Sequence, residues 1–200
     1  MALFKLLTSI NVSSTNSNWD EIIRLHRELR NMLMEYWMTE TVFTFNWWFL
    51  LFTTIGFFVV WLIVLDKKRI IEIASFGLLV GTAVFVLDMI GISLVLWSYP
   101  DRLFPLMTPI VEIHKFHLPI IYMIIYQYYN TWKSFLIALT IASLIFAFIL
   151  EPVTAWLGIY EIYHWKYIYS FPIYIFGGIV LRWLIIKVKQ VEKRKKVPGT

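Results

Sequence analysis

The chain has 200 residues, of which 60% are hydrophobic and 18% aromatic, and its mean hydropathy is +0.70. Soluble domains are roughly 45–50% apolar, so this composition excludes an ordinary soluble protein and predicts an all-α, polytopic membrane helix bundle. The absence of cysteine excludes disulfides and thiol chemistry. The net charge of +5 is concentrated in the tail KVKQVEKRKK at 187–196, which indicates contact with anionic membrane lipids rather than with nucleic acid.

The first 45 residues form an N-terminal segment. Its start, MALFKLLTSI, is followed by a polar stretch without a convincing cleavage site, so we expect it to be retained. Residues 18–37 predict an amphipathic helix, because at helical spacing the apolar side chains fall on one face and the charged side chains on the opposite face. The apolar positions are Ile22, Leu25, Leu29, Leu33 and Tyr36, and the charged ones are Arg24, Arg27, Glu28 and Glu35. We expect this helix to lie on the membrane surface; a lid or a partner-binding helix is the alternative.

Five membrane spans are predicted in a bundle that covers residues 46–187. Four are continuous apolar runs, at about 46–65, 72–97, 133–156 and 168–187. The remaining span, between 103 and 129, contains Pro105, Pro109 and Pro119, which prevent one regular helix. Irregular backbone within a membrane must be buried in protein or face water. Residues 188–200 complete the chain as a basic tail.

The distribution of lysine and arginine predicts the orientation. If the tail is cytoplasmic, then Lys67, Lys68, Arg69 and Lys133 lie on the same side, as the positive-inside rule requires. We therefore expect a multi-pass protein of the cell membrane with its N-terminus outside and its C-terminus in the cytoplasm.

Two carboxyl groups lie within the apolar runs. Asp88 lies 18 residues after Ile70, and Glu151 lies 19 residues after Trp132, so both are about 27 Å from the cytoplasmic ends of their spans. An acid at such depth is costly and is by default a functional-site hypothesis. We predict Asp88 and Glu151 as catalytic residues. The alternatives are a structural acid bonded to a tyrosine or tryptophan for Asp88, and an interfacial residue for Glu151.

Prolines and aromatic side chains gather at the level of these acids. This predicts a polar and aromatic pocket that opens to the outside and is closed toward the cytoplasm by regular helices. Its predicted substrate-binding residues are Trp97, Tyr99, Tyr122, Tyr126, Trp156, Tyr160 and Tyr174.

Metal and cofactor signals are weak. Glu112, His114 and His117 form E-x-H-x-x-H, which suits a divalent metal, but the motif lies in a proline-rich segment without a second ligand cluster. We therefore predict no metal site and name these three only as weak candidates. No nucleophile elbow, P-loop or dinucleotide fingerprint is present, so no cofactor is predicted.

Over residues 30–187 the chain resembles an uncharacterised family of small multi-pass membrane proteins of Bacilli and Clostridia, within the Firmicutes. The resemblance rests on Asn46-Trp47-Trp48, Asp88-x-x-Gly91, Tyr99-Pro100, Tyr126-Gln127-Tyr128, Glu151-Pro152 and, most specifically, Tyr169-Ser170-Phe171-Pro172-Ile173-Tyr174. The family has no established activity, so the resemblance implies the fold and the membrane location only.

The pocket also has a fainter likeness to the carotenoid and meroterpenoid cyclases, which place acids among intramembrane aromatic rings. We predict binding of a lipophilic small molecule and acid-catalysed cyclisation or hydration of an isoprenoid, a lyase or isomerase reaction. One alternative is a non-catalytic sensor or subunit of an envelope complex, with a second copy or another membrane protein as partner. Another is an ion-coupled carrier.

Overall fold

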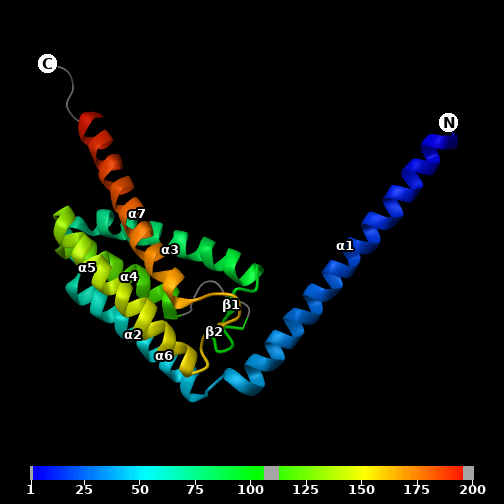
Figure 1. Ribbon diagram of the computed structural model, residues 1–200, viewed down its shortest axis with the longest axis horizontal. Coiled ribbons are helices and arrows are strands. Elements are labelled where there is room, and N and C mark those ends of the chain that lie inside the picture. The colour runs from blue at the N-terminus through cyan, green and yellow to red at the C-terminus, as the bar shows by residue number, and fades with distance from the viewer. Residues whose placement is uncertain (1, 106–112, 196–200) are drawn as a thin grey trace.

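A computed structural model describes residues 2–105 and 113–195, with side chains described for 17–105 and 116–192 (Figure 1). Four helical segments are long and apolar enough to cross a membrane: Phe45–Val64, Lys67–Ser93, Trp132–Trp156 and Tyr167–Glu192. They confirm a helical membrane protein and four of the predicted spans. The segment predicted to be broken by prolines contains helix α4, Ile113–Tyr128, which has 16 residues and holds Pro119 inside it. The count of five spans stays a prediction.

Helix α4 forms the centre of the bundle. It packs against α2 (Phe45–Val64), α3 (Ile70–Ser93), and α5 (Trp132–Ile145). Side chains on every side of α4 are buried, namely Leu118, Ile120, Tyr122, Met123, Ile125 and Tyr126. A helix that is apolar all round belongs inside a bundle, whereas the longer helices keep an exposed apolar face for lipid.

Helix α3 ends earlier than the sequence predicts. The expected span reached Trp97, but the last helical residue is Ser93, and Trp97–Ser98 form the short strand β1. The amide of Leu96 donates to the carbonyl of Gly91, and Val95 has a positive φ of 52°, which together make a Schellman-type end. This turn brings Trp97 back over the last turn of α3.

Strand β1 pairs with strand β2, Glu161–Ile162, in an antiparallel ladder (Figure 1). The amides of Tyr163 and His164 also donate to the carbonyl of Leu96. We call this end of the bundle the β end, and the opposite end, which holds the 3₁₀ turn Lys67–Arg69, the basic end.

Helix α5 continues through a π-helical turn, Phe146–Leu150, into α6, Glu151–Trp156. The amide of Glu151 donates to the carbonyl of Phe146, five residues earlier. Proline at 152 lacks an amide proton, and its ring would crowd the carbonyl four residues back in a regular helix, so the wider turn gives it room. Glu151 is 2% exposed, although Ile149, two residues earlier, is 54% exposed.

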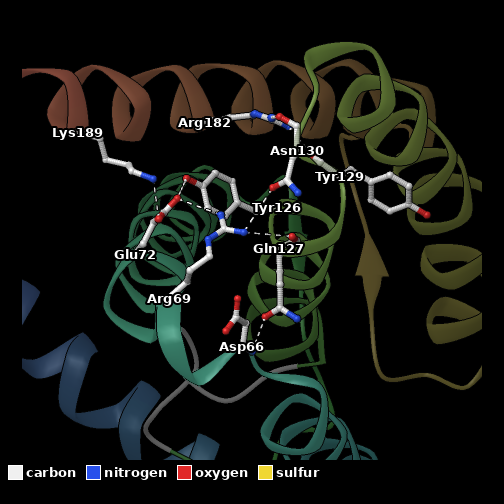
Figure 2. Close-up of polar contacts among 9 residues, drawn as sticks. All are labelled: Asp66, Arg69, Glu72, Tyr126, Gln127, Tyr129, Asn130, Arg182 and Lys189. Atoms are coloured by element: carbon white, nitrogen blue, oxygen red, sulfur yellow. Dashed lines mark hydrogen bonds and ion pairs between the residues drawn. The ribbon is translucent and has the colours of Figure 1, made fainter. Parts of the chain in front are cut away.

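At the basic end, Glu72 joins three elements (Figure 2). It accepts hydrogen bonds from Tyr126 of α4 at 2.5 Å and from Arg69 at 3.1 Å, and it pairs at 2.6 Å with Lys189 of helix α7, Tyr167–Lys195. Helices α3 and α7 run in opposite directions, and these contacts hold them together at this end.

Arg182 of α7 closes the same region. It is 4% exposed and donates to the carbonyls of Tyr129 at 2.9 Å and Asn130 at 2.5 Å, in the turn between α4 and α5. Its guanidinium carbon lies 4.2 Å from the centre of the Phe135 ring and 4.9 Å from that of Trp132. A buried charge is stabilised in this way by carbonyls and aromatic faces.

Candidate functional site

A cavity of about 210 Å³ lies between α3 and α7, beneath the two strands. Its lining includes seven of the nine residues that the sequence predicts as a site: Asp88, Trp97, Tyr99, Tyr122, Glu151, Tyr160 and Tyr174. The rest of the lining is mostly apolar. Both intramembrane acids therefore face one cavity, together with five of the predicted aromatic residues.

Asp88 lies near the end of α3 and is 6% exposed. One carboxylate oxygen accepts a hydrogen bond from the Trp97 indole nitrogen at 3.0 Å and another from the Tyr99 hydroxyl at 3.0 Å. The early end of α3 produces this arrangement, because the chain turns back and returns both donors to the acid.

Gly91 makes room for the Trp97 indole. A Cβ atom at position 91 would overlap the six-membered ring of that side chain. Glycine is thus required by the close approach of a side chain to the helix rather than by its own backbone conformation.

Glu151 is held by donors from the last helix. The Tyr174 hydroxyl donates to one carboxylate oxygen at 2.5 Å, and the Ser170 hydroxyl donates to the other at 3.1 Å. The Trp165 indole donates in turn to Ser170 at 3.0 Å. Ser170 and Tyr174 are four residues apart, so they share one face of α7.

Ser170 and Trp165 line the cavity, but they were not among the predicted site residues. Ser170 belongs to the string Tyr169–Tyr174 on which the family resemblance rests, and its four-residue spacing from Tyr174 is a signal that could have identified it. No comparable spacing marks Trp165, because it precedes the helix and reaches Ser170 from the loop.

The tyrosines of the cavity are packed against one another. The rings of Tyr99 and Tyr160 lie 5.3 Å apart, and the Tyr122 hydroxyl donates to the carbonyl of Tyr174 at 2.7 Å. Burial raises the pKa of Tyr160 above its usual value, and the nearby charges of Glu151 and Asp88 raise it further. Tyr160 therefore keeps its proton at neutral pH.

Two predicted pocket residues lie elsewhere. Tyr126 is one helical turn from Tyr122, toward the basic end, where its ring stacks on Phe76 at 4.5 Å and its hydroxyl binds Glu72 (Figure 2). Trp156 is 84% exposed and does not line the cavity. The prediction of Tyr126 and Trp156 as residues of this pocket is therefore wrong.

The weak metal candidates are only partly within the described residues. Glu112 and the side chain of His114 lie outside them. His117 is 6% exposed, and its ring meets the Phe57 ring edge-on at 4.3 Å. Within the ranges that the structure describes, no group of three or more histidine, aspartate or glutamate side chains is arranged to hold a metal ion.

The arrangement has a defined chemical capacity. Two carboxyl groups can exchange protons with a bound molecule, and the hydroxyl and indole donors around them fix their orientation. The indole and phenol faces can stabilise a positive charge that develops nearby. In an apolar surrounding such electrostatic effects are stronger than in water.

Comparisons with protein-family models, with curated proteins and with solved structures gave no match. The family resemblance found in the sequence therefore stays a prediction.

Proposed function

We propose that this protein binds a lipophilic small molecule that reaches the cavity from the lipid bilayer, between α3 and α7. The observation that carries the proposal is the exposure of part of the lining: Leu87 and Ile90 of α3 are 48% and 51% exposed, and Ile173 of α7 is 36% exposed. The cavity is thus continuous with the apolar surface that these helices present to lipid.

The lateral route replaces the opening toward the outside that the sequence predicts. At the β end the ring centres of Trp97 and Trp165 lie 5.0 Å apart above the cavity. Helices α3 and α7 are held together at the basic end by Glu72 and Lys189. The space between the helices is therefore the favoured route of entry.

The size of the cavity limits what it holds. Its volume of about 210 Å³ is smaller than the roughly 300–1,000 Å³ of common ligand pockets. We expect the polar end of the ligand and its first carbons to lie beside Asp88 and Glu151, while the remaining hydrocarbon stays between the helices and in the bilayer. An isoprenoid or another single-chain amphiphile fits this description.

The reaction that fits best is acid-catalysed cyclisation or hydration of an isoprenoid. Asp88 donates a proton to an alkene carbon, and the resulting cation is stabilised by the faces of Trp97, Tyr99 and Tyr160. Glu151 then takes a proton, either from the cation in a cyclisation or from the water that adds in a hydration. The proton count balances in both cases.

The membrane arrangement proposed with this function has five spans, with the N-terminus outside and the C-terminus in the cytoplasm of the cell. The support is the charge of the basic end, where Arg69 of the turn Lys67–Arg69 and Lys189 of α7 both pair with Glu72. Membership of the family of Bacilli and Clostridia is proposed on the sequence motifs alone.

The test is identification of the bound molecule. The full-length protein is purified in nanodiscs, and the extracted lipophiles are compared by mass spectrometry with those of D88N, E151Q and the control E161Q, whose residue is exposed on β2. We expect a specific lipophile with the wild type and E161Q and its loss from both cavity variants. Equal occupancy in all four proteins would overturn the proposal.

Turnover is tested separately, by incubation of the same proteins with linear isoprenoids. New cyclised or hydrated products with the wild type and E161Q, and none with D88N, support catalysis. A bound lipophile without any product would support the binding function but exclude this chemistry. It would then favour the alternative that the protein is a sensor or a subunit of an envelope complex. If D88N and E151Q do not fold, the acids are structural.

A further inference from the structure

Helix α1, Ala2–Tyr36, leaves the bundle and runs away from the other helices (Figure 1). Its described side chains have a broad apolar face. At about 100° per residue, the apolar positions within 19–36 that lie on this face occupy an arc of about 140°, in which the only other residue is His26. They are Trp19, Ile22, Leu25, Leu29, Met32, Leu33 and Tyr36.

The part of the chain that the structure describes leaves this apolar face largely uncovered. Trp19 is 61% exposed, Leu29 is 54% and Met32 is 66%. Within the described residues, α1 packs chiefly on the π-helical turn that follows it, Trp37–Thr41. Burial of this face therefore requires a partner beyond these described residues.

The width of the face indicates the shape of that partner. A two-stranded coiled coil buries a narrow seam, whereas an arc of about 140° fits an extended apolar surface. Tryptophan and tyrosine at its two ends are side chains that favour the boundary between hydrocarbon and water. A lipid surface matches both properties.

The charges on the opposite face select the kind of lipid. Between residues 19 and 36 there are four acidic and three basic side chains, which gives a net charge of −1. Arg24 pairs with Glu21 at 2.6 Å and with Glu28 at 2.5 Å, so this arginine is already paired within the helix. Attraction to anionic headgroups is therefore weak, and apolar burial has to supply the binding.

The base of α1 lies at the level of the membrane boundary. The Trp37 indole donates to the carbonyl of Arg102 at 3.0 Å, and Thr41 is fully buried and donates to Asp101 at 3.2 Å. Beside it, Phe43 is 69% exposed and Phe45 is 73% exposed, where the span α2 begins. Exposed aromatic side chains at the end of a span mark the interface.

We infer that residues 19–36 bind the surface of the bilayer through this apolar face, and that zwitterionic lipid is sufficient. The inference is independent of what the cavity binds. It also connects the membrane surface to the cavity through hydrogen bonds. The Trp37 indole donates to the carbonyl of Arg102, and the Arg102 guanidinium donates to the carbonyl of Tyr99 at 2.6 Å. The Tyr99 hydroxyl in turn donates to Asp88.

The test uses the absence of native cysteine. Single cysteines are introduced into the full-length chain on the apolar face, as L29C and M32C, and on the polar face, as R27C and N31C. Each is labelled with an environment-sensitive fluorophore in phosphatidylcholine nanodiscs that hold one copy. We expect blue-shifted emission, quenched by quenchers in the lipid chains, for L29C and M32C only, with no change at high salt or after addition of phosphatidylglycerol.

Three results would overturn the inference. The first is equal emission from both faces, which means that the helix stands in water. The second is a requirement for anionic lipid. The third is a blue shift that occurs only in larger discs with several copies and is accompanied by excimer emission from pyrene at position 29, which identifies a second copy of the chain as the partner.

Discussion

Tyr174 of α7 donates its hydroxyl to Glu151 of α6 at 2.5 Å, inside the cavity and at the wide π-helical turn of the preceding helix. Tyr174→Phe removes this donor and keeps the ring. A buried carboxylate that loses a donor is destabilised by about 1–3 kcal/mol. We expect a lower free energy of unfolding for Y174F, measured by denaturant titration.

The matched control is Tyr129→Phe, because the Tyr129 hydroxyl forms no hydrogen bond within the described residues. We expect Y129F to unfold as the wild type does. If Y174F and Y129F are equally stable, the Tyr174 hydroxyl does not contribute to holding Glu151.

Gly91→Ala tests the contact between α3 and Trp97. The added methyl overlaps the indole, so the ring must move and its hydrogen bond to Asp88 is lost. Overpacking of this kind costs about 1–3 kcal/mol. Gly56→Ala is the control, because nothing lies within 4 Å of its new methyl and alanine favours a helix over glycine by about 0.5–1 kcal/mol.

The two glycine variants are compared by thermal unfolding and by tryptophan emission. We expect a lower midpoint and altered emission for G91A and a midpoint at or above that of the wild type for G56A. An unchanged emission spectrum in G91A would contradict the position of Trp97.

Arg182→Gln tests the closure of the basic end. The substitution removes the charged donor from the carbonyls of Tyr129 and Asn130, and hydrogen bonds to charged groups contribute about 1.5–3 kcal/mol. We expect R182Q to be markedly less stable in denaturant titration than K187Q, which removes an exposed charge from the same helix. R182K should be intermediate, since one ammonium cannot reproduce the planar fork. Equal stability of R182Q and K187Q would show that the turn is held by other contacts.

A double-mutant cycle measures the pair of Glu72 and Lys189. Glu72 is largely buried, with 18% of its side chain exposed, so we expect a coupling near the upper end of the roughly 0.2–1 kcal/mol found for surface pairs. Arg24 and Glu28, whose side chains are 55% and 53% exposed on α1, provide the reference cycle and should couple more weakly. The reverse order would mean that α3 and α7 are not joined by charge.

The orientation is tested with a reporter fused after Thr200. The positive charge of the basic end predicts activity of a reporter that functions only in the cytoplasm. A reporter that functions only outside the cell should be inactive at this position. Activity of the second reporter would reverse the orientation.

The sequence predicts that Asp88 and Glu151 share one level, because an α-helix rises about 1.5 Å per residue, and the structure places both acids in the lining of one cavity. Their meeting in one cavity depends on the order of the helices around α4, which residue number does not determine. Tyr126 matches Tyr122 in type, but it lies one helical turn nearer the basic end, where its hydroxyl donates to Glu72.

The end of α3 was also missed, for a local reason. The run from Gly77 to Trp97 is apolar except for Thr82, Asp88 and Ser93, so hydropathy gives no boundary near its end. The helix nevertheless ends at Ser93, where Val95 adopts a positive φ and Trp97 folds back onto Gly91. Tertiary packing of the indole, rather than a glycine or proline signal, sets this boundary.

The donors of the two acids differ in their distance along the chain, and this has a consequence for membrane insertion. Asp88 accepts hydrogen bonds from Trp97 and Tyr99, which follow it by 9 and 11 residues, so these bonds can form while later segments are still being synthesised. Glu151 accepts hydrogen bonds from Ser170 and Tyr174, which follow it by 19 and 23 residues and belong to the last helix. A nascent chain that ends before α7 lacks both of these donors to Glu151, so we expect entry of the final helix to stabilise the span that carries this acid.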